Sequence, residues 1–445
     1  MRYEKYKQTG TKWITSIPVS WDMQKIGALF VQRKEKVSDK DFAPISVTKN
    51  GILPQLATAA KTDDGDNRKK VCVGDFVINS RSDRKGSCGV SDLEGSVSLI
   101  NIVLQPREQL SGKYAHYLLR NHLFSEEYYR NGRGIVADLW TTRYSEMKTI
   151  LLPVPPREEQ DQIVRYLDWQ VSKINRLIAA KRKQIALLKE HRTAKINQAV
   201  TTGIHCDTQL AYTGYNWLPY APANWKPVPA KALFRNITEL RRLDDSMLAA
   251  TQKYGLIEQT EYMRLEERRI VLANDNLDKW LHTEPNDFII SLRSFQGGLE
   301  MCSKPGCVTW HYVVLRSQRN IYPDFYKWFF KSAAYIGALQ KTSDLIRDGQ
   351  DLRFSNFVKV GLFIIPMDEQ REIAEYLNRE IPKYDVAISN LEKQIDQITE
   401  LRTRLISDVV TGQIDVRGIE VPEFEMVRDT VEEQEEDAEE IMQET

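Results

Sequence analysis

The sequence predicts an α+β protein: two tandem-duplicated α+β domains separated by a pair of long helices that form an antiparallel coiled coil with pseudo-twofold symmetry. Three observations predict this class. The phrase "PREEQDQIVRYL" at 156–167 nearly returns as "PMDEQREIAEYL" at 366–377. Each phrase opens a run of more than 40 residues without glycine. Each run also carries apolar residues at the spacing of a packed helix.

The repeat extends along almost the whole chain. The spacing between matched segments stays between 204 and 212 positions, while most intervening residues differ. Because chance does not keep such a register, we infer a tandem duplication. The matched segments are 10–26 with 214–228, 49–55 with 253–259, 74–81 with 286–293, 143–145 with 353–355, and 196–204 with 406–414.

The first part of each copy predicts an α+β domain. Short apolar runs between Gly, Asn and Asp predict strands and turns, and the stretches 114–130 and 324–341 predict helices. We expect the tail to be acidic and disordered. The predicted boundaries are 1–152 for the first domain, 153–203 for its helical region, 204–362 for the second domain, 363–419 for its helical region and 420–445 for the tail.

A long helix is predicted to follow each domain. The first covers 157–202, about 70 Å at 1.5 Å per residue, and Gly203 ends it. The second covers 368–411, where we expect Pro382 to cause a kink or break near Ile381.

Apolar residues at alternating steps of four and three predict a coiled-coil seam along both helices. Since the helices have similar lengths and a domain lies between them, each is the expected antiparallel partner of the other. The alternative is that each helix packs only on its own domain. The predicted seam contains Ile174, Ile178, Lys181, Ile185, Leu188, Lys195 and Ala199 in the first helix, and Tyr384, Ile388, Leu391, Ile395, Ile398, Arg402, Leu405 and Val409 in the second.

The net charge of zero conceals an asymmetry. Residues 420–445 contain twelve acidic residues and one basic residue and carry −11, so residues 1–419 carry +11. A basic body favours a polyanionic partner such as a nucleic acid. The alternative is an acidic terminus of no consequence.

The sequence contains no phosphate-binding loop, no dinucleotide-binding glycine motif and no Asn/Asp-Pro-Pro-Tyr stretch of an adenine methylase. Cys302 and Cys307 with His311 favour buried thiols over a zinc site, because zinc sites use tighter pairs. Five cysteines without tight pairs indicate a reducing compartment, and the polar N-terminus lacks the apolar core of a secretory signal. We therefore expect a cytoplasmic protein.

Basic and polar residues beside turn residues are the candidate DNA contacts. Arginine and glutamine suit base edges, and lysine suits phosphates. For each residue alone, the alternative is an ordinary solvated charge. The candidates are Lys49, Asn50, Arg68, Lys69, Lys70, Arg81, Arg84, Lys85, Arg133, Lys253, Tyr254, Arg264, Arg293, Ser294 and Gln296.

The order and duplication of these motifs resemble the specificity subunit of type I restriction–modification systems. The resemblance rests on 10–26 and 214–228, on the two opening phrases and on the helix ends, and it covers residues 1–418. It implies two target-recognition domains, each recognising half of an asymmetric bipartite DNA site, with the helices setting the spacer. It further implies that helix-opening residues such as Glu159, Gln160, Glu369 and Gln370 belong to the coiled coil or dock partner subunits.

The resemblance implies a non-catalytic chain. Its partners would be double-stranded DNA, two methylase subunits and restriction subunits, and S-adenosylmethionine, ATP and magnesium would belong to those partners. The alternatives are a coiled-coil scaffold whose terminal domains bind proteins, and an enzyme with an unrecognised centre.

Overall fold

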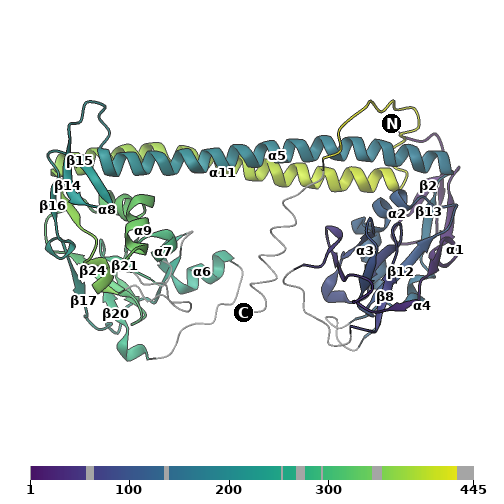
Figure 1. Ribbon diagram of the computed structural model, residues 1–445, viewed down its shortest axis with the longest axis horizontal. Coiled ribbons are helices and arrows are strands. Elements are labelled where there is room, and N and C mark those ends of the chain that lie inside the picture. The colour runs from purple at the N-terminus through teal and green to yellow at the C-terminus, as the bar shows by residue number, and fades with distance from the viewer. Residues whose placement is uncertain are drawn as a thin grey trace. The chain divides into compact units, whose positions relative to one another are not determined.

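The computed structural model describes residues 2–56, 65–134, 140–251, 254–266, 276–291, 294–342 and 353–427, apart from the side chains of Phe295 and Gln296. The chain divides into two compact units (Figure 1). Unit 1 comprises residues 1–183 and 392–445, and unit 2 comprises residues 184–391.

Unit 1 contains mixed strands and short helices followed by a long helix. A four-stranded antiparallel sheet has the order β10-β9-β12-β4, and a three-stranded sheet has the order β11-β8-β5. The elements are β1 (Tyr6–Gln8), β2 (Ser16–Pro18), β3 (Asp22–Lys25), α1 (Ile26–Leu29), β4 (Phe30–Gln32), β5 (Lys36–Val37), β6 (Ile45–Thr48), β7 (Gly51–Pro54), β8 (Arg68–Val71), β9 (Phe76–Asn79), η1 (Ser82–Arg84), β10 (Cys88–Val90), β11 (Gly95–Val97), β12 (Asn101–Pro106), α2 (Gly112–Leu119), α3 (His122–Arg130), α4 (Tyr144–Met147), β13 (Leu151–Val154) and α5 (Arg157–Thr202).

Unit 2 repeats this order of elements. Its four-stranded sheet, β22-β21-β24-β17, matches β10-β9-β12-β4 strand for strand. The elements are β14 (Leu210–Tyr215), β15 (Leu218–Pro222), β16 (Lys226–Val228), η3 (Ala230–Ala232), β17 (Phe234–Ile237), β18 (Leu248–Thr251), β19 (Gly255–Glu258), α6 (Gln259–Glu266), η4 (Leu277–Lys279), β20 (Leu281–Thr283), β21 (Phe288–Ile290), α7 (Ser294–Gly297), β22 (Glu300–Met301), β23 (Gly306–Val308), β24 (Val313–Ser317), α8 (Pro323–Phe330), α9 (Ala333–Gln340), α10 (Phe354–Phe357), β25 (Leu362–Ile364) and α11 (Met367–Val410).

One of the two inner strands of each four-stranded sheet is buried along its whole length. All four residues of β9 and all three of β21 are buried, as expected for strands with a partner on each side and side chains packed on both faces. The same sheet order in both units confirms the predicted duplication and the α+β class.

Each domain core includes turns from both long helices. In unit 1, Ile163 of α5 and Val409 of α11 belong to the cluster around Phe76. In unit 2, Val200 of α5 and Leu377 of α11 belong to the larger core cluster. Since complete burial of such an apolar side chain contributes about 1.5–3 kcal/mol, these contacts attach both helices to each domain.

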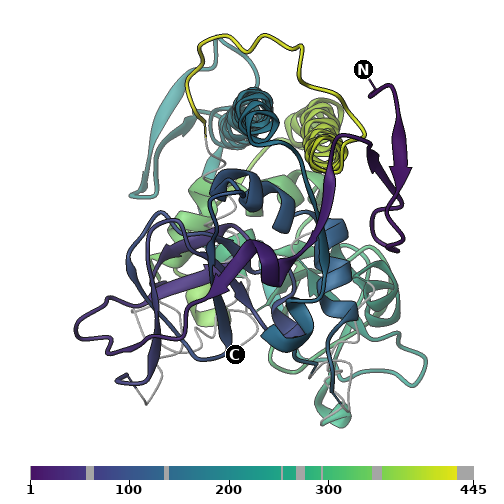
Figure 2. The same cartoon turned by 90° about the vertical axis from the view of Figure 1, so that its right-hand side faces the viewer.

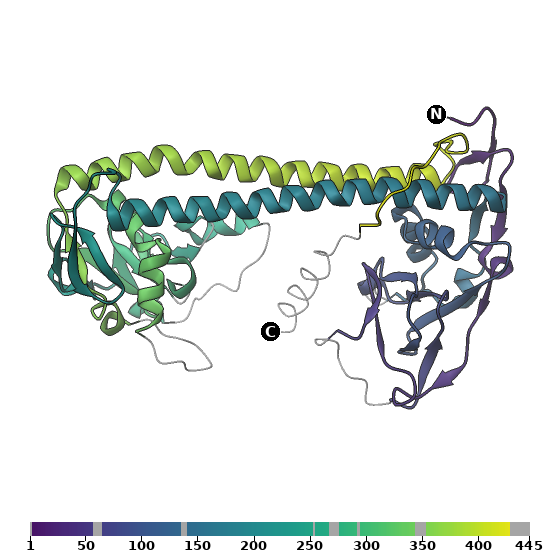
Figure 3. The ribbon, with the colours of Figure 1, turned by 45° about the horizontal axis from the view of Figure 1, so that its top comes forward.

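Between these attachments the helices pack on each other, and they lie side by side in Figures 1 and 3. All predicted seam residues are buried or half-buried. In unit 1, Arg402 donates to Asn175 at 2.7 Å and Lys181 donates to Gln394 at 2.6 Å. Residue numbers therefore rise along α5 as they fall along α11, which is an antiparallel pairing.

Unit 2 shows the same pairing direction. Arg192 Nε lies 2.8 Å from an Asp385 carboxylate oxygen, and Lys195 Nζ lies 3.7 Å from Glu380. Figure 2 looks along the two helices and shows them as adjacent rings. The prediction that the helices pack on each other is confirmed. The alternative, in which each helix packs only on its own domain, applies only to the end turns of α5 and α11.

The helix ends agree with the sequence to within one residue. Gly203 and Gly412 follow α5 and α11 with φ of +80° and +74°, a conformation that glycine adopts without steric cost. The predicted break at Pro382 is wrong, because α11 continues through it. Pro382 is exposed while its neighbour Ile381 is fully buried, so packing holds the helix past the missing hydrogen bond.

A buried glutamine ties the first turn of α5 to its own domain. Gln160 is fully buried, and its amide oxygen accepts from the backbone N–H of Ser111 at 2.8 Å. Its amide nitrogen donates to the carbonyls of Pro155 at 2.9 Å and Gln109 at 3.0 Å. One side chain thus satisfies three backbone groups on two segments.

Gln370 repeats this arrangement in unit 2. It accepts from the N–H of Tyr322 and donates to the carbonyl of Ile365, each at 2.8 Å, and it is 3% exposed. Gln160 and Gln370 are therefore internal anchors, so the expectation that they form a docking surface is wrong. The reason is that each side chain faces the domain that precedes its helix.

The preceding glutamate holds a tryptophan in both units. Glu159 accepts from the indole of Trp21 at 3.0 Å and from the hydroxyl of Tyr3 at 2.6 Å. Glu369 accepts from the indole of Trp225 at 2.9 Å. Burial, and then the bond to Glu159, raise the pKa of the Tyr3 hydroxyl, so it remains a donor. These pairs explain why the Trp and Glu-Gln motifs recur together.

The first residues of the acidic tail are ordered against α5, contrary to the expected disorder from Glu420 onward. Asn175 donates to the carbonyl of Val427 at 2.9 Å, and the Val427 N–H donates to Ser172 at 3.2 Å. The segment after α11 passes across α5 in Figure 3. The stretch 420–427 carries apolar residues, whereas most of the acids lie in 428–445, outside the described residues.

A buried histidine in unit 2 lies between two carboxylates. His282 is 1% exposed, and its ring nitrogens lie 2.9 Å from Asp245 and from Glu284. Burial opposes protonation, but the hydrogen bonds to Glu284 and Asp245 prevail and raise the pKa of His282 above its usual value. When the ring is protonated, it links two segments of the domain electrostatically.

We expect Gln160→Leu to destabilise unit 1 by about 1–3 kcal/mol, because it leaves three buried backbone groups unpaired. Gln370→Leu should have a similar effect on unit 2. The measurement is the urea midpoint followed by circular dichroism. Gln198→Leu, at an exposed site on α5, is the control. Equal midpoints for Gln160→Leu and this control would show that the anchor contributes nothing.

The His282 cluster predicts a pH-dependent stability. Because its pKa is raised in the folded state, the stabilisation is complete below the unfolded-state pKa, about 6.5, and is lost as pH rises through the folded-state value. His282→Gln should cost about 2 kcal/mol at pH 6 and less at pH 9. The exposed His191→Gln is the control in urea titrations. A cost that is the same at both pH values contradicts the assignment.

Candidate nucleic-acid interface

Five predicted contacts of unit 1 lie at its surface, in the turn between β6 and β7, around η1 and after α3. They are Lys49, Arg81, Arg84, Lys85 and Arg133. Several make exposed ion pairs, such as Arg81 with Asp83 at 3.0 Å and Arg133 with Glu146 at 4.0 Å. Exposed pairs contribute about 0–1 kcal/mol, so a phosphate can replace the carboxylate at little cost.

Lys85 and Asn50 have defined surroundings at this surface. Lys85 pairs with Glu126, and this hydrogen bond lowers the pKa of the Glu126 carboxyl. The Asn50 amide nitrogen is buried without a hydrogen-bond partner among the described residues. Asn50 therefore has an unused donor in the turn between β6 and β7.

Strand β8, at the centre of the three-stranded sheet, contains the candidate contacts Arg68, Lys69 and Lys70, which were expected beside turn residues. Arg68 is 7% exposed and donates to the hydroxyl of Ser96 at 2.8 Å, and its burial lowers its pKa. Lys69 donates to the carbonyls of Leu99 and Asn101, and burial lowers its pKa. These two side chains bind the protein itself, which corrects their assignment as DNA contacts.

Lys70 is also engaged within the sheet. Its ammonium lies 3.3 Å from Glu35 and 4.7 Å from the centre of the Phe42 ring. A lysine held by a carboxylate and an aromatic face is a weaker candidate for phosphate than an extended surface side chain.

In unit 2, Ser294 is fully buried, and its hydroxyl accepts from the Ser291 N–H at 2.9 Å, so its assignment as a DNA contact is corrected. Arg264 is exposed on α6 and pairs with Glu261 at 2.7 Å. The hydroxyl of Tyr254 donates to Glu266 at 2.8 Å. Lys253, Arg293 and the Gln296 side chain lie outside the described residues.

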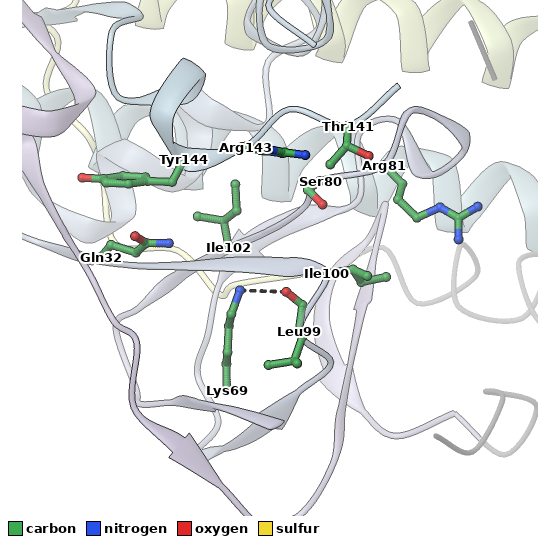
Figure 4. A pocket seen from close by; sticks show the side chains of 10 residues that line it. All are labelled: Gln32, Lys69, Ser80, Arg81, Leu99, Ile100, Ile102, Thr141, Arg143 and Tyr144. Carbon is green, nitrogen blue, oxygen red and sulfur yellow. Dashed lines mark hydrogen bonds between the residues drawn. The ribbon is translucent and has the colours of Figure 1, made fainter. Parts of the chain in front are cut away.

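An open pocket of about 660 Å³ lies beside the surface cations of unit 1 (Figure 4). Residues from β4, β8, the end of β9, the approach to β12 and the start of α4 line it. Figure 4 shows Ile102 in the middle, Gln32 and Tyr144 on one side, and Arg81 on the other. The pocket therefore brings together segments that are distant in the sequence.

Three pocket residues were not among the predicted contacts: Gln32, Arg143 and Tyr144. Arg143 is exposed, Gln32 and Tyr144 are half-buried, and all three line the pocket beside the predicted Arg81 and Lys69. The recurrence of "RYS" at 143–145 as "RFS" at 353–355 is the sequence signal for Arg143 and Tyr144. By itself it indicates the duplication and does not indicate a binding role.

The structure assigns local roles to other motifs. Cys302 and Cys307 are buried free thiols, as predicted, and burial raises the pKa of Cys307 to about 11. Within the described ranges, no three metal-ligating side chains gather to hold an ion. Of the helices that the structure describes, none combines the length and hydropathy of a membrane span.

Comparison with known proteins gives one sequence relative and several structural neighbours. No family model matches the chain. The chain is 20% identical over 401 residues to a protein of Methanocaldococcus jannaschii assigned as the specificity subunit of the type I restriction enzyme MjaX, and the match covers 87% of each chain.

Two solved chains match most of this chain's length. One belongs to a study of complex assembly and conformational transition of the type I restriction–modification system. It has a TM-score of 0.58 at 15% identity, and the match covers 89% of this chain and 99% of that one. The other, the HsdS subunit of Thermoanaerobacter tengcongensis, has a TM-score of 0.48 at 15% identity, with 92% and 100% covered. The chain thus resembles type I specificity subunits in sequence along most of its length, and it shares its fold with a chain of such a system.

Proposed function

We propose that this chain is the DNA-specificity subunit of a type I restriction–modification complex. The observation that carries this proposal is the similarity to a specificity subunit over 401 residues, in a chain whose two units repeat one sheet order. Each domain would recognise one half of a bipartite site. The paired helices would set the length of the unrecognised spacer between the halves.

Differences between the two domains support an asymmetric target. The segment after β9 forms η1 with exposed cations, whereas the segment after β21 leads into α7 with the buried Ser294. The order of the strands is the same in both sheets, whereas the residues that follow β9 and β21 differ. Two domains of one design would thus recognise different base sequences.

The outer faces of the helices support docking of partner subunits. Leu177, Leu187, Val386 and Leu401 are between 47% and 60% exposed on helices whose inner faces are packed. We propose that two methylase subunits bind these faces and that restriction subunits join the complex. S-adenosylmethionine, ATP and magnesium would belong to those subunits, this chain would be non-catalytic, and the complex would act in the cytoplasm.

Exchanging residues 26–150 for those of a homologue with another target should change one half-site only. Adenine methylation of the reconstituted complex, mapped at base resolution, measures the result. The matched control exchanges residues 230–360 and should change the other half-site. A change in both half-sites, or in neither, after the first exchange would contradict independent recognition.

DNA binding by the assembled complex should weaken steeply with salt, because phosphate neutralisation releases counterions. With six phosphate contacts, affinity should fall about a thousandfold between 50 and 200 mM salt. Fluorescence anisotropy on a labelled duplex measures this dependence. Binding that is absent or insensitive to salt would instead favour a coiled-coil scaffold for proteins.

A further inference from the structure

The pocket of unit 1 contains an amide and a guanidinium that the protein does not use. Within the described residues, the Arg143 guanidinium and the Gln32 amide form no hydrogen bond or ion pair. Lys69 differs, since two carbonyls hold it, and Arg81 forms an exposed ion pair with Asp83. Arg143 and Gln32 are therefore the guanidinium and the amide of this pocket without a protein partner among the described residues, beside the hydroxyls of Ser80, Thr141 and Tyr144.

The surface around these two side chains is apolar. Leu99 is 41% exposed and Ile100 is 45% exposed, and both line the pocket beside the buried Ile102. Exposed apolar residues next to unpaired polar groups are typical of a recognition surface. A site that binds only phosphate would need cationic side chains and would not need the exposed Leu99 and Ile100.

The duplication places the same two chemical groups in unit 2. Gln32 at the end of β4 corresponds to Asn236 in β17, 204 positions on, and both side chains are amides. Arg143 corresponds to Arg353, and each directly precedes a short helix. Arginine forms two hydrogen bonds with the guanine edge, and glutamine or asparagine forms two with the adenine edge.

We infer that this pocket receives base edges of the first half-site, with Gln32 and Arg143 as specificity-determining residues. Leu99 and Ile100 would contact thymine methyl groups or exclude water at the same edge. This inference rests on the proposed function. The recognition site of unit 1 then lies at the junction of β4, β12 and α4, and not at the predicted contacts Arg68 and Lys69 in β8.

The test uses the complete complex and base-resolution maps of methylated adenine on genomic DNA. Gln32→Ala and Arg143→Ala should each relax one base position of the first half-site and leave the second half-site unchanged. The expected loss of discrimination there is roughly 5- to 150-fold. Arg107→Ala, at an exposed arginine of unit 1 outside the pocket, is the charge-matched control and should preserve the target.

Arg143→Lys separates base recognition from charge. Lysine keeps the positive charge but lacks the planar guanidinium that forms two hydrogen bonds with one base. This variant should therefore lose discrimination at the same base position as Arg143→Ala. An unchanged half-site in both variants, or an equal loss at all sequences with a reduced salt slope, would overturn the inference in favour of a phosphate contact or no contact. If the unmodified chain directs no methylation, the proposed function itself fails. Thermal melting confirms that each variant is folded.

Discussion

The Glu-Gln pair at the start of each long helix, with its glutamine buried, is the constraint on which the rest of the structure depends. Gln160 and Gln370 join the first helical turn to backbone groups of the preceding domain, and Glu159 and Glu369 hold a tryptophan of the same domain. A helix fixed at its first turn has a fixed direction. Antiparallel pairing continues that direction along the seam. The buried apolar turns of both helices add to this attachment of each domain to its helix.

The repeated attachment also explains how one fold tolerates different recognition surfaces. Buried groups occupy the frame: the strands β9 and β21, the two glutamines and the helix seam. The groups that differ lie in loops, at η1 and α7, where exposed ion pairs contribute little to stability. Loop residues can therefore change with little effect on the fold. This separation suits a protein whose target must differ from that of its relatives.

Sequence patterns predicted the long helices and their seam correctly, but they did not predict which polar side chains line the pocket of unit 1. Helix α5 and the seam followed from periodicity, and the glycine at 203 marked the helix end. The predicted break at Pro382 was wrong, because the buried neighbour Ile381 holds the helix past one lost hydrogen bond. Arg68 is buried through a partner distant in the sequence, Ser96, whereas Ser294 is buried and bonds the nearby Ser291. The Gln32–Arg143 pocket could not be predicted, since it assembles from five separate segments.

The central claim is that two related domains on paired helices recognise a divided DNA target. The most direct measurement maps methylated adenines genome-wide in cells with and without this chain. The account predicts one motif, present only with the chain, made of two defined segments separated by a gap of fixed length and free sequence. A continuous motif, or identical maps from both cells, would contradict it.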